Sequence, residues 1–326
     1  MENIAYTINN YNGKLGLGVD TNILSNDKVK RDLGLIKFKG WNLTVNGSSS
    51  FEYILPKYAG CKNVNEVKTV DANYLTTDII DGVWAEHLSN LTNGSNMFYQ
   101  CSNLTSFTSD LSNLTEGRSM FRDCTALTSF NADLSNLTNG EYMFRNCSKL
   151  ETFNSNLSSL TNGWYMFRDC TALTSFNGDL SSLEDAEMMF YGCTNLTSFS
   201  SNLPSLTNSD YMFRDCTALT SFNGDLSSIT SGYRMFYGCT NLTSFNSDLS
   251  GMGEGRYMFY NCKLDAPSVE RILTSIPTFT SGIRILTLGI QSSAASKFKE
   301  ITGYTPSSYE GSVSYKGWSI EVKINA

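Results

Sequence analysis

The chain has 326 residues and a formal net charge of −7, and only 17% of its residues are charged. This acidic balance argues against a surface that tracks nucleic-acid phosphates, which needs clustered Lys and Arg, and it gives no reason to expect binding to an anionic membrane. A single histidine, His87, removes histidine-based triads and histidine-rich metal sites, so the composition argues against an enzyme.

Residues 1–50 start with neither a basic segment nor an apolar one, and nowhere in the chain do about 18 apolar residues follow one another. We therefore expect no membrane insertion and no secretion by a classical signal. The segments KLGLGVD at 14–20, SNDKVKRDL at 25–33 and KGWNLTVNG at 39–47 predict a strand, a helix and a strand. The same order returns at the C-terminal end, so we interpret 1–50 as an α/β module that resembles a cap.

Residues 51–96 are predicted to form irregular entry turns, because only one segment in them copies the regular pattern found further on. That segment, KYAGCKNVNEV at 57–67, follows the pattern of FYGCTNLTSF at 236–245. The match places Cys61 in the same column as the cysteines of the regular turns.

Residues 97–262 repeat every 23 residues without an insertion, which is typical of a solenoid. Each of the eight turns opens with Met-Phe, and a cysteine follows three residues after the Phe. The methionines are Met97, Met120, Met143, Met166, Met189, Met212, Met235 and Met258. The cysteines are Cys101, Cys124, Cys147, Cys170, Cys193, Cys216, Cys239 and Cys262, so all nine cysteines of the chain share one column.

The consensus of a turn is MFxxCxxLTSFxxDLSxL, and a single turn cannot bury its apolar edge alone. Stacking places Phe130 on Phe107 and Phe153, which gives one continuous core. The LTSF segment is rich in Thr and Phe, so it predicts the strand, pairing in parallel at about 4.8 Å per turn. Eight turns then span roughly 40 Å.

The cysteine column has two interpretations. It could be a metal or redox ladder, or each cysteine could be a small buried hydrophobic residue. We favour the second, because no CxxC spacing occurs and one cysteine per turn leaves no local pair to bind zinc. We therefore predict no metal and no cofactor. An odd number of cysteines also argues against disulfides, and so does an N-terminus without a recognisable secretion signal.

A column of Asp and Asn residues follows each strand, and it too has two interpretations. A calcium ladder would need the DxDxDG cluster, which no turn contains. Side-chain hydrogen bonds that form turns explain the column more simply. Its members are Asp110, Asp133, Asn156, Asp179, Asn202, Asp225 and Asp248.

The repeat, as in MFYGCTNLTSFNSDLS at 235–250, resembles the BspA-like leucine-rich repeats, whose short turns carry the same MF, Cys and Leu columns. The resemblance covers about 97–262. It implies a right-handed leucine-rich-repeat solenoid used for adhesion or recognition at bacterial surfaces, or in phages that infect gut Bacteroidetes. Because bacterial members normally carry a secretion signal, we expect a virion component made in the host cytoplasm, with a bacterial cell-surface adhesin as the alternative.

Residues 263–326 break the period and predict an α/β cap that closes the stack, as terminal repeats must for solubility. We expect a helix in 265–277, a strand at 283–290, a polar helix at 292–303 and a final strand at 316–324. Trp318 in this cap corresponds to Trp41 in the N-terminal module. That module could equally dock the protein onto other virion proteins, since exposed strand edges invite pairing.

Identical residues in different turns are interpreted as scaffold. MFRDCTALTSFNGDLSS stands at 166–182 and again at 212–228, after which LEDAEM at 183–188 and ITSGYR at 229–234 differ at every position. Recognition is therefore expected in the columns that flank the MF pair, where Tyr and Arg dominate. This Tyr/Arg edge consists of Tyr99, Arg122, Tyr142, Arg145, Tyr165, Arg168, Tyr191, Tyr211, Arg214, Arg234, Tyr237, Tyr257 and Tyr260.

The Tyr/Arg edge could also be a ladder that only stabilises the solenoid, with Asp123, Asp169 and Asp215 as ion-pair partners of the arginines. If it binds, the expected partner is a glycan or protein on a host surface. A glycan-degrading enzyme ranks last. It would need paired carboxylates in a cleft, and Glu184, Asp185 and Glu187 lie in one turn with no expected facing partner.

Overall fold

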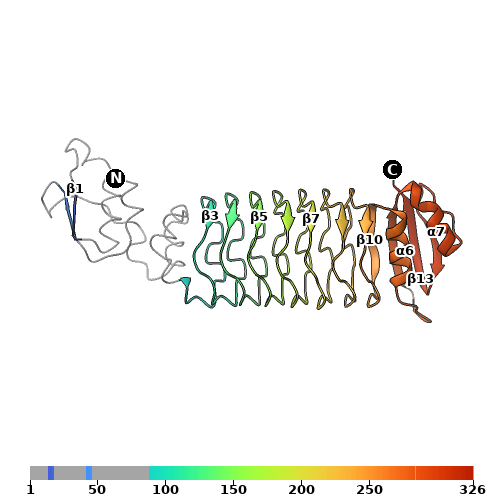
Figure 1. The fold of residues 1–326 in the computed structure, drawn as a ribbon, viewed down its shortest axis with the longest axis horizontal. Coiled ribbons are helices and arrows are strands. Elements are labelled where there is room, and N and C mark those ends of the chain that lie inside the picture. Colours follow the sequence, from blue (N-terminus) through green and yellow to red (C-terminus); the bar gives the residue numbers. More distant parts are fainter. Residues whose placement is uncertain (1–13, 18–41, 46–87, 283, 326) are drawn as a thin grey trace.

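The computed structural model describes residues 14–17, 42–45, 88–282 and 284–325. Residues 88–282 and 284–325 form an elongated row of turns closed by a C-terminal cap (Figure 1). Most of the two segments predicted as the N-terminal module and the entry turns, with Cys61 and His87, lies outside the described residues. None of the helices in the described part has the length and apolar character needed to cross a membrane.

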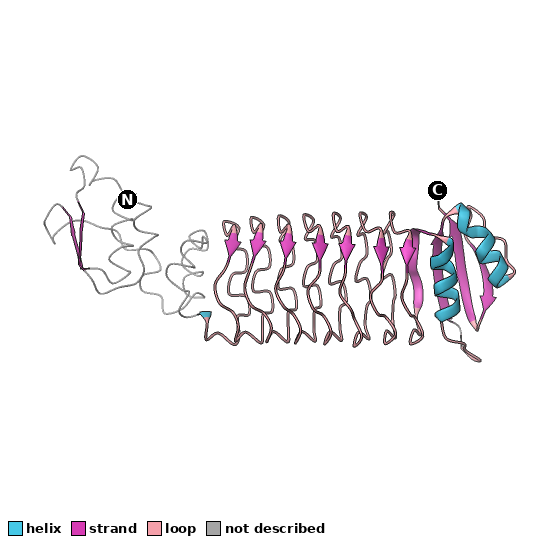
Figure 2. Cartoon of the chain, in the orientation of Figure 1, coloured by secondary structure: helices cyan, strands magenta, loops and turns pink. Residues whose placement is uncertain are grey.

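Seven two-residue strands, one per 23-residue turn, line one side of the row (Figure 2). Each pairs in parallel and in register within two ladders, β3 to β7 and β8 to β9, so that Ser aligns with Ser or Thr and Phe with Phe. This confirms the predicted leucine-rich-repeat solenoid with a parallel sheet. The strands are β3 (Ser106–Phe107), β4 (Ser129–Phe130), β5 (Thr152–Phe153), β6 (Ser175–Phe176), β7 (Ser198–Phe199), β8 (Ser221–Phe222) and β9 (Ser244–Phe245).

Backbone hydrogen bonds also join successive turns at the MF segments. The Phe98 N–H donates to the Met120 carbonyl at 2.8 Å, and the same contact recurs along the row, as between Phe121 and Met143 at 2.9 Å. These bonds satisfy the backbone polar groups of segments that belong to no strand.

Two phenylalanines per turn build the core. The rings of the MF column stack face to face, with Phe144 and Phe167 5.4 Å apart, and the strand column stacks in the same way. The two columns meet edge to face, as Phe153 and Phe167 do at 4.8 Å. Such pairs add about 0.5–1.5 kcal/mol each to the stabilisation from burial. In β4 to β9 the Ser or Thr that precedes the buried strand Phe is exposed.

The eight described cysteines are free and buried, each with 0% exposure. From Cys124 onward each thiol donates to the carbonyl of the MF phenylalanine one turn earlier, as Cys170 Sγ does to Phe144 O at 3.1 Å. Burial is the first cause that raises the pKa of these thiols, as for Cys147. Across the described residues no group of His, Cys, Asp and Glu side chains has the geometry of a metal site.

The Asp and Asn column forms turns, as predicted. The carboxylate of Asp179 accepts from the Ser181 N–H at 2.9 Å, and Asp225 and Ser227 make the same contact. Asn202 is the exception, because Pro204 occupies the position of the donor and has no N–H.

The cap is an α/β structure. Its sheet has the order β10-β11-β13-β12, so the last solenoid turn supplies an edge strand of the cap. The strands are β10 (Gly255–Leu264), β11 (Arg284–Ile290), β12 (Gly311–Tyr315) and β13 (Trp318–Ile324). The helices are α6 (Ala266–Ser275), η4 (Ser292–Ala294) and α7 (Ala295–Thr302).

These elements match the predicted helices and strands of the C-terminal segment, except that β12 was missed and the MF segment of the last turn extends into β10. A two-residue turn joins β12 to β13. Lys316 and Gly317 have φ of 51° and 81°, the pair of positive values that a type I′ hairpin requires. The Tyr-Lys-Gly-Trp segment is the signal that could have predicted this hairpin.

Only two elements of the N-terminal segment are described. β1 (Lys14–Leu17) and β2 (Asn42–Val45) pair in parallel, as β11 and β13 do in the C-terminal cap. A KGW motif stands at the start of the second strand in both pairs: it ends just before β2, and its Trp is the first residue of β13. That the two ends are copies of one module remains a prediction.

Candidate binding surface

The Tyr/Arg edge is produced by two reversals of the backbone in every turn. The residue before each Met has φ between 53° and 59°, and the residue before each Cys has φ between 59° and 77°. Between them the Met and Phe side chains point into the core. The residues that flank the pair are therefore directed outward, and those of the Tyr/Arg edge are partly exposed.

The two left-handed positions carry different kinds of residue. The position before Cys holds Gly, Asn or Asp in seven of eight turns, which are the types that tolerate this conformation. The position before Met instead holds bulky side chains such as Tyr165, Tyr211 and Arg234. A left-handed residue of this kind costs about 1–2 kcal/mol. The left-handed backbone at the position before Met therefore disfavours these bulky side chains, and its conformation does not explain why they occur there.

In the C-terminal half, the side chains after each Phe form one continuous stack of planar groups. The Arg168 guanidinium lies 4.7 Å from the centre of the Tyr191 ring, and Arg214 lies 5.3 Å from Tyr191 and 4.9 Å from Tyr237. The Tyr237 and Tyr260 rings then stack at 5.1 Å. Arginine and tyrosine alternate from Arg168 to Tyr237, so a ring separates the two cations.

Each arginine in this stack has a carboxylate beside it. Arg168 and Arg214 form ion pairs with Asp169 at 3.2 Å and Asp215 at 3.3 Å. The next turn makes room for the carboxylate, because a Cβ atom on Gly192 would lie 2.6 Å from Asp169 Oδ1. The structural unit is therefore two turns, Arg-Asp followed by Tyr-Gly. The predicted ion pairs are confirmed, Arg122 with Asp123 at 3.5 Å included.

Two aromatic residues of this surface were missed by the sequence analysis, Trp164 and Tyr233. Trp164 contacts Tyr142 and Tyr165 with ring centres 5.7 Å and 5.1 Å apart, and Tyr233 lies 5.2 Å from Tyr211. Both stand two residues before a Met, in a column that also holds Ser, Arg, Glu and Asp. Because this column has no dominant residue type, Trp164 and Tyr233 were not recognised as part of the surface. Variation between turns was, however, the property used to predict the binding surface.

Tyrosine hydroxyls on the surface lie close to charged groups. Burial first, and then Tyr142 and Glu187, raise the pKa of Tyr165, while Arg168 and Arg145 act in the opposite direction. The edge therefore carries phenols, guanidinium groups and carboxylates within reach of one another.

The carboxylates at 184–187 do have a neighbour, so the expectation that they have no facing partner is wrong. Asp210 in the following turn interacts with Asp185 and Glu187, and burial is the first cause that raises the pKa of both Glu187 and Asp210. Asp210 also accepts hydrogen bonds from the Ser231 hydroxyl and the Tyr233 N–H. The sequence did not predict this contact, because Asp210 is brought next to Asp185 and Glu187 only when the two turns stack.

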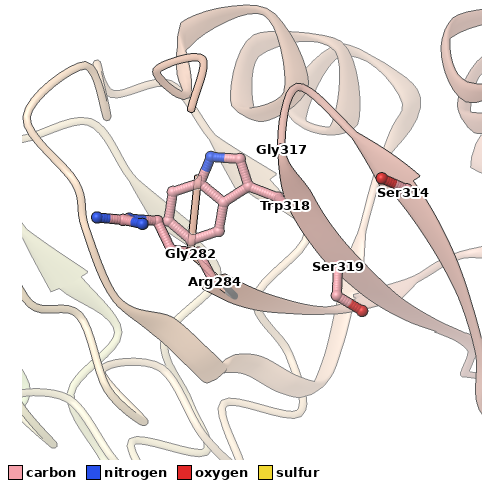
Figure 3. A pocket seen from close by; sticks show the side chains of 6 residues that line it. All are labelled: Gly282, Arg284, Ser314, Gly317, Trp318 and Ser319. Carbon is pink, nitrogen blue, oxygen red and sulfur yellow. The ribbon is translucent and has the colours of Figure 1, made fainter. Parts of the chain in front are cut away.

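The cap contains a small pocket, shown in Figure 3, with a volume of about 210 Å³. It lies at the start of β11 and β13, and it is lined by Gly282, Arg284, Ser314, Gly317, Trp318 and Ser319. Ligand pockets usually measure roughly 300–1,000 Å³. Its size and the lack of an acid, base or nucleophile pair in its lining make it a weaker candidate than the Tyr/Arg edge.

The stacked turns, each with one short strand and a core of Leu and Phe, define a leucine-rich-repeat solenoid, a fold that is typically a binding scaffold and not an enzyme. The BspA type leucine rich repeat region matches the chain in six copies, at residues 91–217 and 186–281. These ranges include more than half of the chain, which belongs to the BspA-type leucine-rich repeat family. A comparison with curated protein sequences gives no match.

Proposed function

We propose that this protein is a recognition component of a phage virion, carried on a tail, a fibre or the capsid, whose Tyr/Arg edge binds a glycan or protein on the host surface. Membership of the BspA type supports the general role, since these repeats indicate protein binding and adhesion at surfaces. The position on a virion is a narrower proposal, and it rests on the resemblance to proteins of gut phages.

The observation that carries the binding role is the occupation of left-handed backbone positions by large side chains. Tyr142, Tyr165, Tyr211, Arg234 and Tyr257 have φ between 56° and 59°, where Gly or Asn would be less strained. Tyr and Arg provide large contact areas with a polar end and are enriched in the energetically dominant parts of interfaces. Stacking among themselves offsets part of the strain, and their exposed parts remain available to a partner.

The test replaces Arg168, Tyr191, Arg214 and Tyr237 together by Ala and measures attachment of the purified protein to host cells. Binding should fall at least a hundredfold, because these side chains form the centre of the edge. The matched control replaces Ser129, Ser175, Ser221 and Ser244 by Ala on the strand face, and it should bind normally. Circular dichroism must show that both variants are folded. Normal attachment by the folded edge variant would refute the proposed surface.

The location needs a separate experiment. Antibody labelling of purified phage particles should place the protein on the virion, whereas labelling of the cell envelope in uninfected bacteria would favour the alternative, a bacterial cell-surface adhesin. Release of reducing ends from a bound glycan would instead support a glycan-degrading enzyme.

A further inference from the structure

We infer that the N-terminal half of the Tyr/Arg edge is a binding site for an acidic glycan, one that carries sulfate or carboxylate groups on its sugar rings. The inference rests on the proposed function of the edge and adds the chemistry of its ligand. The site, here called the arginine row, consists of Arg122, Arg145 and Arg168 with the flanking rings of Tyr142, Trp164 and Tyr165.

The arginine row is where the alternation of arginine and tyrosine fails. Three consecutive turns place a guanidinium in the column after Phe, and turns stack about 4.8 Å apart. Elsewhere in this column a tyrosine separates Arg168 from Arg214. Like charges at this spacing repel one another, so a scaffold alone would favour the alternating arrangement. An anion bridging the row would convert this repulsion into attraction.

The row also lacks one of its carboxylates. Arg122 and Arg168 are paired with Asp123 and Asp169 through their Nε atoms. At the equivalent position beside Arg145 stands Asn146, whose amide donates to Asp123 at 3.0 Å. Among the described residues, Arg145 has no ion pair, whereas Arg122 and Arg168 each have one, and the Glu187 carboxylate near Tyr165 forms none with the row.

Arg145 is also held more loosely than the unpaired arginine further along. Arg234, which has no ion pair among the described residues either, is surrounded by four tyrosine rings with centres 5.0–5.8 Å from its guanidinium. Within the described part of the chain, the guanidinium of Arg145 contacts one ring, that of Tyr142, at 5.8 Å. Its guanidinium therefore keeps donors that can form charge-assisted hydrogen bonds to an anion.

Aromatic side chains beside the row favour a glycan over a simple anion. Trp164 lies in the turn next to Arg145, and its ring packs against Tyr142 and Tyr165. The indole N–H of Trp164 is buried and lies beside the Glu187 carboxylate, so the flat face of the ring and not the N–H is the part that can contact a sugar. Sugar rings pack their C–H faces on aromatic rings, and guanidinium groups bind sulfate or carboxylate with two parallel hydrogen bonds. Together these groups match a sugar chain with repeated acidic substituents.

The test measures binding of the full chain to three polymers by calorimetry: chondroitin sulfate, hyaluronan and neutral dextran. The acidic polymers should bind and dextran should not, and added salt should weaken the binding. Binding to chondroitin sulfate alone, or to hyaluronan alone, would identify sulfate or carboxylate as the required group, and either result supports the inference. Equal binding of dextran, or no binding of either acidic polymer, would overturn it.

The diagnostic variant is Arg145→Tyr, which copies the Arg-Tyr-Arg order already present around Tyr191. It should fold with an unchanged or higher melting temperature and lose about tenfold in affinity for the acidic polymers, while Arg145→Lys should lose less. The charge-matched control is Arg256→Ala, at the far end of the solenoid, and it should bind normally. Equal losses in Arg145→Tyr and Arg256→Ala would show that net charge, and not the arginine row, holds the polymer.

The two proposals fail in different ways. If the acidic polymers do not bind but the Ala variant of Arg168, Tyr191, Arg214 and Tyr237 still loses attachment to host cells, the edge is a binding surface for another ligand. If host attachment survives in that variant, the proposed surface itself is wrong.

Discussion

Phe176 and Cys170 are both fully buried, but they stabilise the solenoid in different ways. The ring of Phe176 packs against Phe167 and Phe190 at 5.5 Å and 4.9 Å and against its counterparts in the neighbouring strands. The thiol of Cys170 fills a small space and donates to one backbone carbonyl. The cysteine column therefore has a polar role that a purely hydrophobic interpretation does not include.

Phe176→Ala should lower the free energy of unfolding by about 3–5 kcal/mol, because a large cavity opens between turns. Cys170→Ala should cost only about 1–2 kcal/mol, for a smaller volume and one weak hydrogen bond. Urea denaturation of both variants checks the order. A larger loss for Cys170→Ala, or zinc released on unfolding, would contradict the role assigned to the cysteines.

At this scale the sequence predicts the core almost completely. Every MF, Cys and Leu column was expected to be buried, and it is, because a fixed period leaves each residue type only one environment. The sequence did not predict the hydrogen bond of each thiol, since the acceptor lies 26 residues away in the chain. It also did not predict the left-handed backbone at Tyr165, because Tyr is a residue that disfavours it.

At the scale of a loop, the segment at 184–187 shows what stacking adds to a local sequence. Asp185 and Glu187 meet Asp210 of the next turn, and burial together with these like charges raises the pKa of Glu187 above its usual 4.5. A carboxyl group whose pKa is higher in the folded chain binds more protons when folded. Its contribution to stability is therefore largest in acid and is lost as the pH rises through the folded pKa.

Glu187→Gln should accordingly raise the melting temperature at pH 7, by no more than about 2 °C because the site is partly exposed. The advantage should disappear as the pH falls below about 4.5, where the wild-type carboxyl is itself protonated. Thermal melts between pH 4 and pH 7 check this. The control is Glu184→Gln, an exposed position in the same loop. A constant difference across the pH range would contradict the assigned cause.

Elements of the cap were predictable where their patterns were long. Helix α6 follows an apolar stripe at Val269, Ile272 and Leu273, and Asp265 caps its first turn. Strand β12 was missed because Gly311, Ser312 and Ser314 are poor strand formers, and pairing with β13 determines its conformation. Of the binding surface, the Tyr and Arg columns were predicted, whereas Trp164 and the unpaired charge of Arg145 depend on contacts between turns.

Over the whole molecule, each turn contacts mainly its two neighbours, so stability is a sum of similar terms along the row. The identical segments at 166–182 and 212–228 occupy equivalent places in two successive two-turn units. Removing one complete unit should therefore restore the same contacts at the new junction.

Deletion of residues 166–211, which joins Tyr165 to Met212, should give a folded solenoid two turns shorter, by roughly 10 Å. Its melting temperature should fall modestly, and small-angle scattering should report the shorter length. The control deletes residues 166–200. The length of this segment is not a multiple of the 23-residue period, so the deletion misaligns the columns of the turns on either side of the junction. If both deletions leave the protein equally stable, the columnar core does not determine the fold.

The column of thiols has a consequence for the order of events during biosynthesis. In the nascent chain the eight described cysteines recur every 23 residues and are all accessible, so an oxidant could join any two of them and trap a wrong pairing. Once the turns have stacked, each of these thiols is fully buried, and from Cys124 onward each donates to a backbone carbonyl, so an oxidant can no longer reach it. Folding must therefore be completed before the chain meets oxidising conditions, and from then on the finished solenoid needs no protection from them.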